Sequence, residues 1–357
     1  MASELTVTSA YLEALERERA ELVAALGPVV DSALVESAHR RSARLSVRLD
    51  ASPLEDATAV AVDRGEVPVL TPPTGAHNGA GWAQALKLAG LPTQDIAAAE
   101  YRGVRAAQAQ EEQLAGQFFD APVATLVHLQ RLIAAELVAD EHLGALRTTS
   151  RAVNDGAQGR VIFLAPDPLR LPGLLDDLDR WVRQARDRHS PLAIAGVVHA
   201  RILQWRPFEA GNGRVARAAS RVALRVTGGD PWGLAVPEGS YLCDPLRYVS
   251  EIAATIRRGA DLRPWNERTG EAVVASLESA ARRAGVSPGS LPARGVHECE
   301  RLAAGEMITV VEFATATGSE RSAAITQLNR LCWAGILRRD PGTHGLRYVR
   351  RAEPGVR

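Results

Sequence analysis

Apolar residues recur at intervals of three and four along most of this 357-residue chain, which is the spacing of one face of an α-helix. Leu12, Leu15 and Leu22 follow this spacing in the first such segment, which the helix-breaking pair Gly27-Pro28 ends. The same periodicity predicts further helices over residues 29–45, 96–114, 123–138, 174–186, 192–204, 213–226, 245–257 and 269–283. A mainly α-helical fold is therefore expected.

Two segments of the first 290 residues depart from this pattern. Residues 67–79 are rich in proline and glycine and read as a loop. Residues 160–166 are β-branched and aromatic, follow the turn sequence Asn154-Asp155-Gly156 and stop at Pro166, so they predict a short strand.

The C-terminal part of the chain has shorter elements. After a linker-like segment at residues 285–292, the pattern predicts two short helices at 310–316 and 322–334, and then two strands at 336–339 and 346–349. A helix, a turn, a second helix and a β-hairpin are the outline of a winged helix. The predicted division is an N-terminal helical region at 1–120, a central domain at 121–285 and a winged-helix-like domain at 286–357.

The composition adds limits on function. Lys+Arg and Asp+Glu both number 42, so the net charge of zero argues against bulk capture of nucleic acid and leaves only local basic patches. Cys243, Cys299 and Cys332 are widely spaced and indicate buried thiols in a reducing compartment. The chain shows neither a signal peptide nor a membrane-length apolar run, and a cytoplasmic location is expected.

The sequence feature that points most directly to chemistry lies between the predicted helices 192–204 and 213–226. Gly211 and Gly213 flank Asn212, and a glycine-bracketed turn that opens a helix leaves backbone N–H groups free for an anion. Arg214 and Arg217 follow, three residues apart and thus on one helix face. Free amides and two guanidinium groups suit a phosphate.

The full string Pro207-Phe208-x-x-Gly211-Asn212-Gly213-Arg214-x-x-Arg217 resembles the signature of the Fic family, His-Pro-Phe-x-(Asp/Glu)-Gly-Asn-Gly-Arg-x-x-Arg. The resemblance covers residues 121–285, and residues 159–169 are similar to the hairpin that the family calls the flap. It implies a mainly α fold: a Fic-type helical domain with a small β-hairpin flap, followed here by the winged-helix-like domain.

The same resemblance implies the site. Family members bind a nucleotide with a divalent metal and move a phosphate-containing group, usually AMP, onto a protein hydroxyl. ATP or another nucleotide is thus the expected ligand. The implied anion hole is Asn212 with the amides of Gly211 and Gly213, and Arg214 and Arg217 correspond to the phosphate-binding arginines. The implied binding residues are Phe208, Gly211, Asn212, Gly213, Arg214 and Arg217.

Two departures from the signature matter for catalysis. The catalytic histidine of the family falls on Arg206, and a guanidinium, which stays protonated, cannot accept the proton of an attacking hydroxyl. The metal-binding acid falls on Ala210, whose methyl group cannot ligate Mg²⁺. Glu209 is adjacent, but neighbouring side chains point in different directions. No metal-binding residue is therefore predicted.

An N-terminal segment resembles the inhibitory helix of the family, Ser/Thr-x-x-x-Glu-Gly/Asn. Ser32 and Glu36 have the required spacing, whereas Ser37 departs at the last position. The resemblance implies that Glu36 pairs with Arg217 and blocks the nucleotide. The alternative is that residues 32–37 are an ordinary part of a helix.

Other residues also have two interpretations. Arg206 is either a structural partner of Glu209 or another acid, or it binds an anion. Arg221 and Arg225 continue the arginine stripe and are interpreted as a solvated or salt-bridged edge, and His199 as a core histidine rather than a ligand.

These residues leave three functions open. The first is a Fic-like nucleotide-binding protein with lost or strongly reduced AMP transfer. The second is an active transferase of altered chemistry in which Arg206 stabilises phosphate charge. The third is a DNA-binding regulator in which the Fic-like domain is a sensor or scaffold. The partners that correspond are a target protein at the flap near residues 161–164, DNA through the arginine-rich residues 319–351, and a second copy of the chain, with no membrane.

Overall fold

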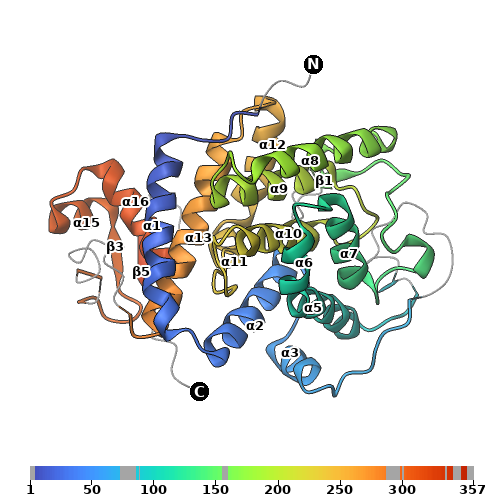
Figure 1. Ribbon diagram of the computed structural model, residues 1–357. Helices are drawn as coiled ribbons and strands as arrows, with labels where there is room; N and C mark the ends of the chain where they lie inside the picture. Colours follow the sequence, from blue (N-terminus) through green and yellow to red (C-terminus); the bar gives the residue numbers. More distant parts are fainter. Residues whose placement is uncertain are drawn as a thin grey trace.

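The computed structural model describes residues 5–72, 86–87, 89–154, 160–286, 298–299, 301–333, 336–340 and 347–351. These residues form a mainly helical fold with a small antiparallel strand pair, as predicted (Figure 1). The N-terminal helices are α1 (Ala10–Leu26), α2 (Ser32–Leu49), α3 (Asp56–Asp63), α5 (Thr93–Ala109), α6 (Glu111–Gln117) and α7 (Pro122–Ala134).

The central part of the chain carries the strand pair and the longest helices. Its elements are β1 (Ala152–Asn154), β2 (Val161–Leu164), α8 (Leu171–Ala185), α9 (Pro191–Trp205), α10 (Asn212–Val226), α11 (Glu238–Cys243), α12 (Pro245–Arg258) and α13 (Arg263–Arg283). The 3-10 turns η1 (Gly27–Val29), η2 (Asp140–His142) and η3 (Pro168–Arg170) connect some of them.

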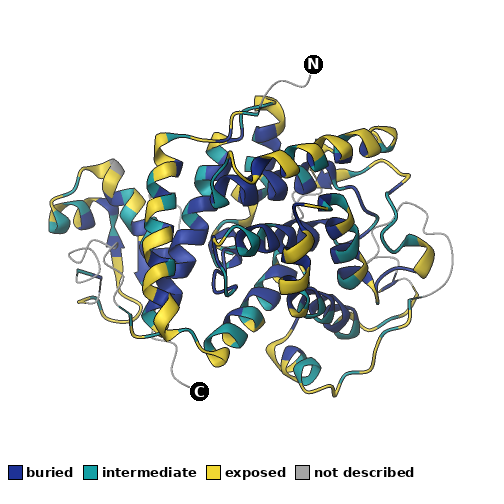
Figure 2. Ribbon diagram, viewed as in Figure 1, coloured by how far each residue is buried: buried dark blue, intermediate teal, exposed yellow. Residues whose placement is uncertain are grey.

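Helix α9 lies at the centre of the molecule. All of its residues except Pro191 and Arg201 are buried, as expected for a helix that is apolar on every side. It packs against α10 and α13, and α10 is largely dark blue in Figure 2. At Gly196 the approach of α13 is so close that a Cβ would lie 2.3 Å from Asn266 Oδ1. Because this packing fixes the position of α9, it also fixes the point at which the following loop begins.

One large apolar core extends through the first two predicted regions, beside two smaller clusters. It includes Val7 and Leu12 near the N-terminus together with Ala280 and Ala281 at the end of α13. Helix α1 packs along α13, and the two stand side by side in Figure 1. The N-terminal helices are therefore part of the body that supports the loop before α10. The predicted domain boundaries stay predictions.

The C-terminal elements have their own core. They are β3 (Met307–Thr309), α15 (Val310–Thr317), α16 (Arg321–Trp333), β4 (Leu337–Asp340) and β5 (Arg347–Arg350), with the antiparallel strand order β3-β5-β4. Phe313, Leu328 and Tyr348 are fully buried in this core. Helix α16 packs on α13 and α11, and Arg330 Nη2 lies 2.5 Å from Glu18 Oε2 of α1. The two predicted helices and two strands are present, and the winged-helix assignment stays a prediction.

Sequence periodicity placed most helices within a few residues, with three exceptions. The predicted helix over residues 96–114 is two helices that meet at Gln110. The short helices α3 and α11 were not predicted. Residues 73–79 of the predicted loop and 287–292 of the predicted linker lie outside the described residues. Within the described part of the chain, each helix is too short or too polar to cross a membrane.

Candidate functional site

The loop predicted to bind an anion connects the end of α9 to the start of α10. Arg206 caps α9 with left-handed backbone angles (φ 43°, ψ 61°), and Gly211 caps α10 at φ 77°. Gly211 adopts this conformation without strain, whereas a non-glycine residue such as Arg206 does so at a cost of about 1 kcal/mol or more. The two reversals turn residues 207–210 back across the start of α10.

The side chain of Asn212 closes this loop on itself. Its Oδ1 accepts a hydrogen bond from Phe208 N at 2.9 Å, and its Nδ2 donates to Phe208 O at 2.7 Å. The ring of Phe208 is fully buried in the main core. Asn212 and Phe208, both predicted as binding residues, thus shape the loop, and the backbone around Gly211 and Gly213 forms the start of the helix.

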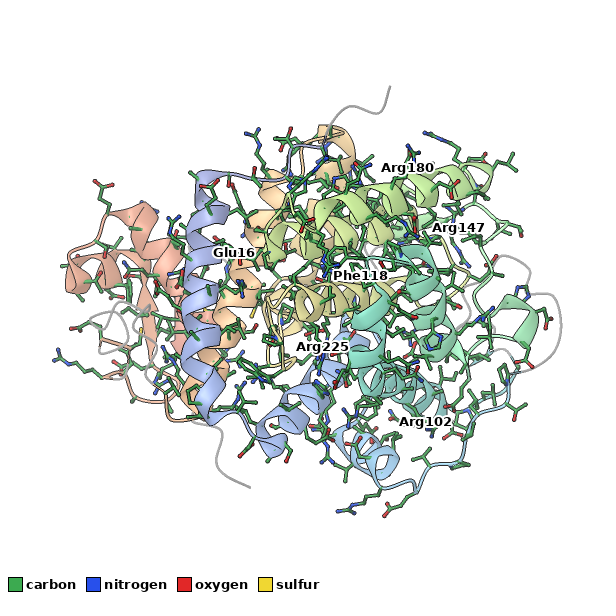
Figure 3. All side chains as sticks on the ribbon, viewed as in Figure 1. Glu16, Arg102, Phe118, Arg147, Arg180 and Arg225 are labelled. Atoms are coloured by element: carbon green, nitrogen blue, oxygen red, sulfur yellow. The ribbon has the colours of Figure 1, made fainter. Side chains whose placement is uncertain are left out.

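Arg147 holds the other side of the loop, a role that sequence reasoning missed. This side chain, labelled in Figure 3, is 1% exposed and donates to four carbonyl oxygens. The acceptors are Arg206 O at 2.8 Å, Trp205 O at 3.1 Å, Thr149 O at 2.6 Å and Pro166 O at 2.6 Å. The backbone N–H of Arg147 also donates to Pro207 O at 2.9 Å. One buried guanidinium therefore joins the end of α9 to the segment that carries the strand pair.

The predicted phosphate-binding arginines converge on one carboxylate, that of Asp50. Arg217 Nη2 donates to Asp50 Oδ1 at 3.0 Å, and Arg214 Nε lies 3.3 Å from Asp50 Oδ2. Both arginines are buried, Arg214 at 6% and Arg217 at 3% exposure, whereas the Asp50 side chain is 26% exposed. A Cβ at Gly213 would lie 2.5 Å from Asp50 Oδ1, so the carboxylate lies against the first turn of α10. An internal anion thus occupies the place predicted for a phosphate.

The opposite charges of Arg217 and Asp50 stabilise this contact. Burial lowers the pKa of Arg217, but the charge of Asp50 and the hydrogen bond between the two outweigh burial and raise that pKa above its usual value. Arg217 also donates from Nε to Ser46 Oγ and from Nη2 to Ser46 O, both at 2.7 Å. Arg214 has a second acid nearby, since its Nη2 lies 3.3 Å from Glu100 Oε1.

The predicted pairing of Glu36 with Arg217 is wrong. Glu36 Oε1 accepts from Arg105 Nη2 at 2.6 Å and from Arg40 Nε at 2.7 Å. Ser32 is the exposed first residue of α2. Glu36 lies about four turns before the end of α2 that reaches the loop, since each turn takes about 3.6 residues.

The C-terminal end of the same helix supplies the contact instead. Ser46 and Asp50 have the spacing of the inhibitory motif, with aspartate in place of glutamate, and both contact Arg217. Ala51 follows with φ 61°, a left-handed conformation in which the motif has glycine or asparagine. The signal Ser46-x-x-x-Asp50 was present in the sequence. Only the fold distinguishes it from the equally spaced Ser32 and Glu36.

Arg206 has no acid as a hydrogen-bond partner among the described residues. Its predicted alternative partner, Glu209, accepts instead from Arg151 Nη2 at 2.8 Å, so that pairing is wrong. The Arg206 Nε is buried without a hydrogen-bond partner in the part of the chain that the structure describes. Burial lowers the pKa of Arg206 and the charge of Asp50 opposes this, but a guanidinium stays a cation at neutral pH. Arg206 is a donor and cannot serve as a base.

The positions that would hold a metal ion lack ligands. Ala210 is buried and packs in an apolar cluster with Ile96, Ala134 and Leu137. Glu209 is turned toward Arg151, and its Oε1 accepts from Thr148 N at 3.3 Å. Within the described ranges, no group of three or more His, Cys, Asp or Glu side chains could hold a metal ion. The residues present therefore do not fit the divalent metal that the family signature implies.

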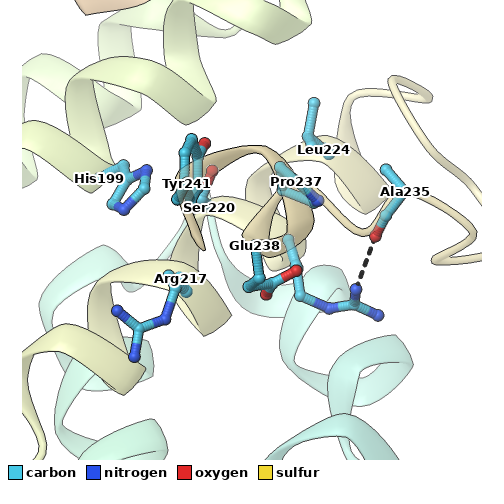
Figure 4. A pocket seen from close by; sticks show the side chains of 9 residues that line it. His199, Arg217, Ser220, Leu224, Ala235, Pro237, Glu238 and Tyr241 are labelled. Atoms are coloured by element: carbon cyan, nitrogen blue, oxygen red, sulfur yellow. Dashed lines mark hydrogen bonds between the residues drawn. The ribbon is translucent and has the colours of Figure 1, made fainter. Parts of the chain in front are cut away.

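Behind Arg217 lies a cavity that is too small for a nucleotide. It measures about 10 Å³, the room of a single water molecule, and Figure 4 shows His199, Arg217 and Glu238 around it. His199 is buried, its Nε2 lies 2.7 Å from Tyr248 Oη, and burial followed by the charge of Arg217 lowers its pKa to about 3. It is a neutral core histidine, as interpreted from the sequence.

The end of the arginine stripe has a different character at each position. Arg221 is buried and donates from Nε to Glu111 Oε1 at 2.7 Å, so it is salt-bridged, one of the predicted alternatives, but lies in the core and not at an edge. Arg225 pairs with exposed Glu112 at 3.4 Å, as expected for an edge. Of the four arginines of the stripe, Arg214 and Arg217 are the two that contact Asp50.

The predicted strand pairs with a preceding one to form a hairpin beside the loop. β1 and β2 are antiparallel, with Ala152 opposite Leu164, and residues 155–159 between them lie outside the described residues. Val161 is 51% exposed and Leu164 is 70% exposed. Arg151, which precedes β1, binds the carbonyl and the carboxylate of Glu209. The hairpin is thus tied to the loop and presents apolar side chains to solvent.

The sequence around this site matches a known family. Residues 120–224, which include the strand pair, the loop and most of α10, match the Fic/DOC family. They form a Fic domain. A search of curated proteins found no match to the chain.

Solved structures show the same fold. A Fic family protein from Desulfovibrio desulfuricans G20 is 19% identical with a TM-score of 0.63, covering 99% of this chain and 100% of that one. Fic-1 from C. elegans is 17% identical with a TM-score of 0.50, covering 76% of this chain and 72% of that one. At these identities the likeness concerns the fold alone. It extends over the C-terminal elements in the first case.

Proposed function

We propose that this Fic domain binds a phosphate-bearing ligand, ATP or another nucleotide, at the start of α10, and that it has lost AMP transfer. The observation that carries the proposal is the carboxylate of Asp50, held between Arg214 and Arg217 against the first turn of α10. A site that holds one internal anion with two buried guanidinium groups and a helix start has the chemistry to hold a phosphate.

The loss of transfer follows from the residues around that anion site. Attack by a hydroxyl on a phosphorus atom requires a group that takes the hydroxyl proton, and Arg206 cannot accept it. Ala210 offers a methyl group where a carboxylate would ligate Mg²⁺. Incubation with labelled ATP, with and without Mg²⁺, tests this directly. Label retained by the protein or its targets would favour the rival function, a transferase of altered chemistry.

Replacement of Arg214 tests the binding site. Arg214→Ala is expected to weaken binding of ATP by about 1.5–3 kcal/mol, the usual contribution of a hydrogen bond to a charged group. Isothermal titration calorimetry with ATP, ADP and AMP measures this change. Arg225→Ala, on the same helix but paired at the surface with Glu112, is the control and should bind like the parent. Equal affinity of Arg214→Ala and the parent would contradict the proposed site.

Replacement of Asp50 tests whether it competes with the ligand. Asp50→Asn is expected to tighten ATP binding about fivefold to thirtyfold, because it releases Arg217 from a partly exposed ion pair that contributes about 1–2 kcal/mol. Glu36→Ala is the matched control from the same helix and should leave the affinity unchanged, since Glu36 contacts Arg40 and Arg105. Tighter binding by Glu36→Ala alone would reverse the assignment of the competing acid.

The other predicted partners stay predictions. Exposed Val161 and Leu164 support a target protein at the hairpin. For DNA, one face of helix α16 packs on α13 and α11, and Arg330 is paired with Glu18, so this arginine is not free for a phosphate of DNA.

A further inference from the structure

Three arginines lie at the loop before α10, and one of them, Arg206, has no ion pair with an acid among the described residues. Arg206 precedes the loop, and Arg214 and Arg217 follow it on α10, where Asp50 and Glu100 are their ion-pair partners and Glu238 lies behind Arg217. Asp50 is also the largest charge that raises the pKa of Arg206, whereas Arg217 and Arg151 lower it.

Two of these arginines have unused hydrogen-bond donors. Arg206 Nε, Arg214 Nε and Arg214 Nη1 are each buried without a hydrogen-bond partner within the described ranges. Arg214 Nε lies 3.3 Å from Asp50 Oδ2 but lacks the geometry of a hydrogen bond. Buried donors on charged groups are costly unless an acceptor satisfies them. An anion with several oxygens would supply acceptors to all three.

The same place is unsuited to a divalent cation. The side of the loop at Ala210 is apolar, with Ile96 and Leu137 as neighbours, and Glu209 is held away by Arg151. Mg²⁺ needs about six oxygen ligands in a tight octahedron, and a guanidinium nearby adds repulsion. The acids in reach, Asp50 and Glu100, both already lie beside Arg214.

We infer that the loop binds its phosphate-bearing ligand without a divalent metal, and that Arg206 supplies the positive charge that a metal ion supplies in other phosphate sites. This inference rests on the proposed function. The preferred ligand is the free nucleotide, with its full phosphate charge, rather than its magnesium complex. A planar guanidinium can bind two phosphate oxygens at once, which a point charge cannot do.

The test is calorimetric titration of the full chain with ADP and ATP in two buffers, one with EDTA and one with excess MgCl₂. The parent is expected to bind in EDTA, with equal or weaker affinity in MgCl₂. Arg206→Gln should lose about tenfold to a hundredfold of the affinity in EDTA, the scale of a lost charged hydrogen bond. Arg206→Lys keeps the charge and should recover part of that loss.

Arg180→Gln is the control, because Arg180 is exposed on α8 and pairs with Asp177 of the same helix. Circular dichroism and the melting temperature establish that each variant is folded before titration. Binding that requires MgCl₂, or unchanged affinity of Arg206→Gln in EDTA, would overturn this inference and leave the proposed function standing. Failure of the parent to bind in either buffer would overturn the proposed function and the inference with it.

Discussion

AMP transfer is expected to rise at least about a hundredfold above the parent when Arg206→His is combined with Ala210→Asp. The first change returns a group that titrates near neutral pH to the position of the general base, whose loss costs about 10²–10⁴ in rate. Histidine also tolerates left-handed backbone angles better than most residues, so φ 43° at this position is no obstacle. The second change returns a carboxylate for Mg²⁺.

The double variant is also expected to be less stable than the parent, so its melting temperature has to be measured together with its activity. Ala210 packs against apolar residues such as Ile96 and Leu137, so an aspartate there buries a carboxylate and is expected to lower the melting temperature. Addition of ATP and Mg²⁺ should recover part of this loss by mass action.

Transfer of label from ATP to the protein or to lysate proteins is the readout, and the two single variants are the controls. Each single variant still lacks one catalytic group and should stay near the parent. Labelling of the parent at the level of the double variant would show that Arg206 and Ala210 do not prevent the chemistry. Adding Asp50→Asn should increase labelling further, because Arg217 is then free for phosphate.

The helices and the loop could be predicted from sequence because their signals are local. Apolar spacing defines a helix within a few turns, and Gly211-Asn212-Gly213 marks a helix start in three residues. Helices α3 and α11 were missed because eight and six residues are too few for a clear period.

The partners of the charged residues could not be predicted, because each pair joins residues far apart in the chain. Arg221 resembled a solvated position on a stripe, yet its acid is Glu111, brought to it by the packing of α6 on α10. Glu36 and Asp50 both follow a serine by four residues. The direction in which α2 crosses the body decides that Asp50 is the one beside Arg217. Burial and long-range pairing are properties of the fold, which residue spacing alone does not contain.

Replacement of Arg147 is expected to cause the largest loss of stability among the changes considered. Arg147→Met removes four hydrogen bonds to carbonyl oxygens and leaves those acceptors buried, at a cost of about 3–5 kcal/mol if each bond contributes about 1 kcal/mol. Methionine keeps much of the side-chain volume, so a cavity is not the main cause. Urea denaturation measures the change as a shift in midpoint at constant slope.

The matched control is Arg183→Met, which removes an exposed arginine from α8 that pairs only with Asp179 among the described residues, and should change stability by about 0.5 kcal/mol or less. Arg147→Lys can reach fewer of the carbonyls and should fall between the two. The side chain of Arg147 donates to the carbonyls of Trp205 and Arg206, and its backbone N–H donates to that of Pro207. Because these carbonyls lie where the loop begins, Arg147→Met should also weaken nucleotide binding under conditions where it is still folded. A loss of stability below about 1 kcal/mol would mean that other contacts hold the end of α9, and that the loop does not depend on Arg147 for its shape.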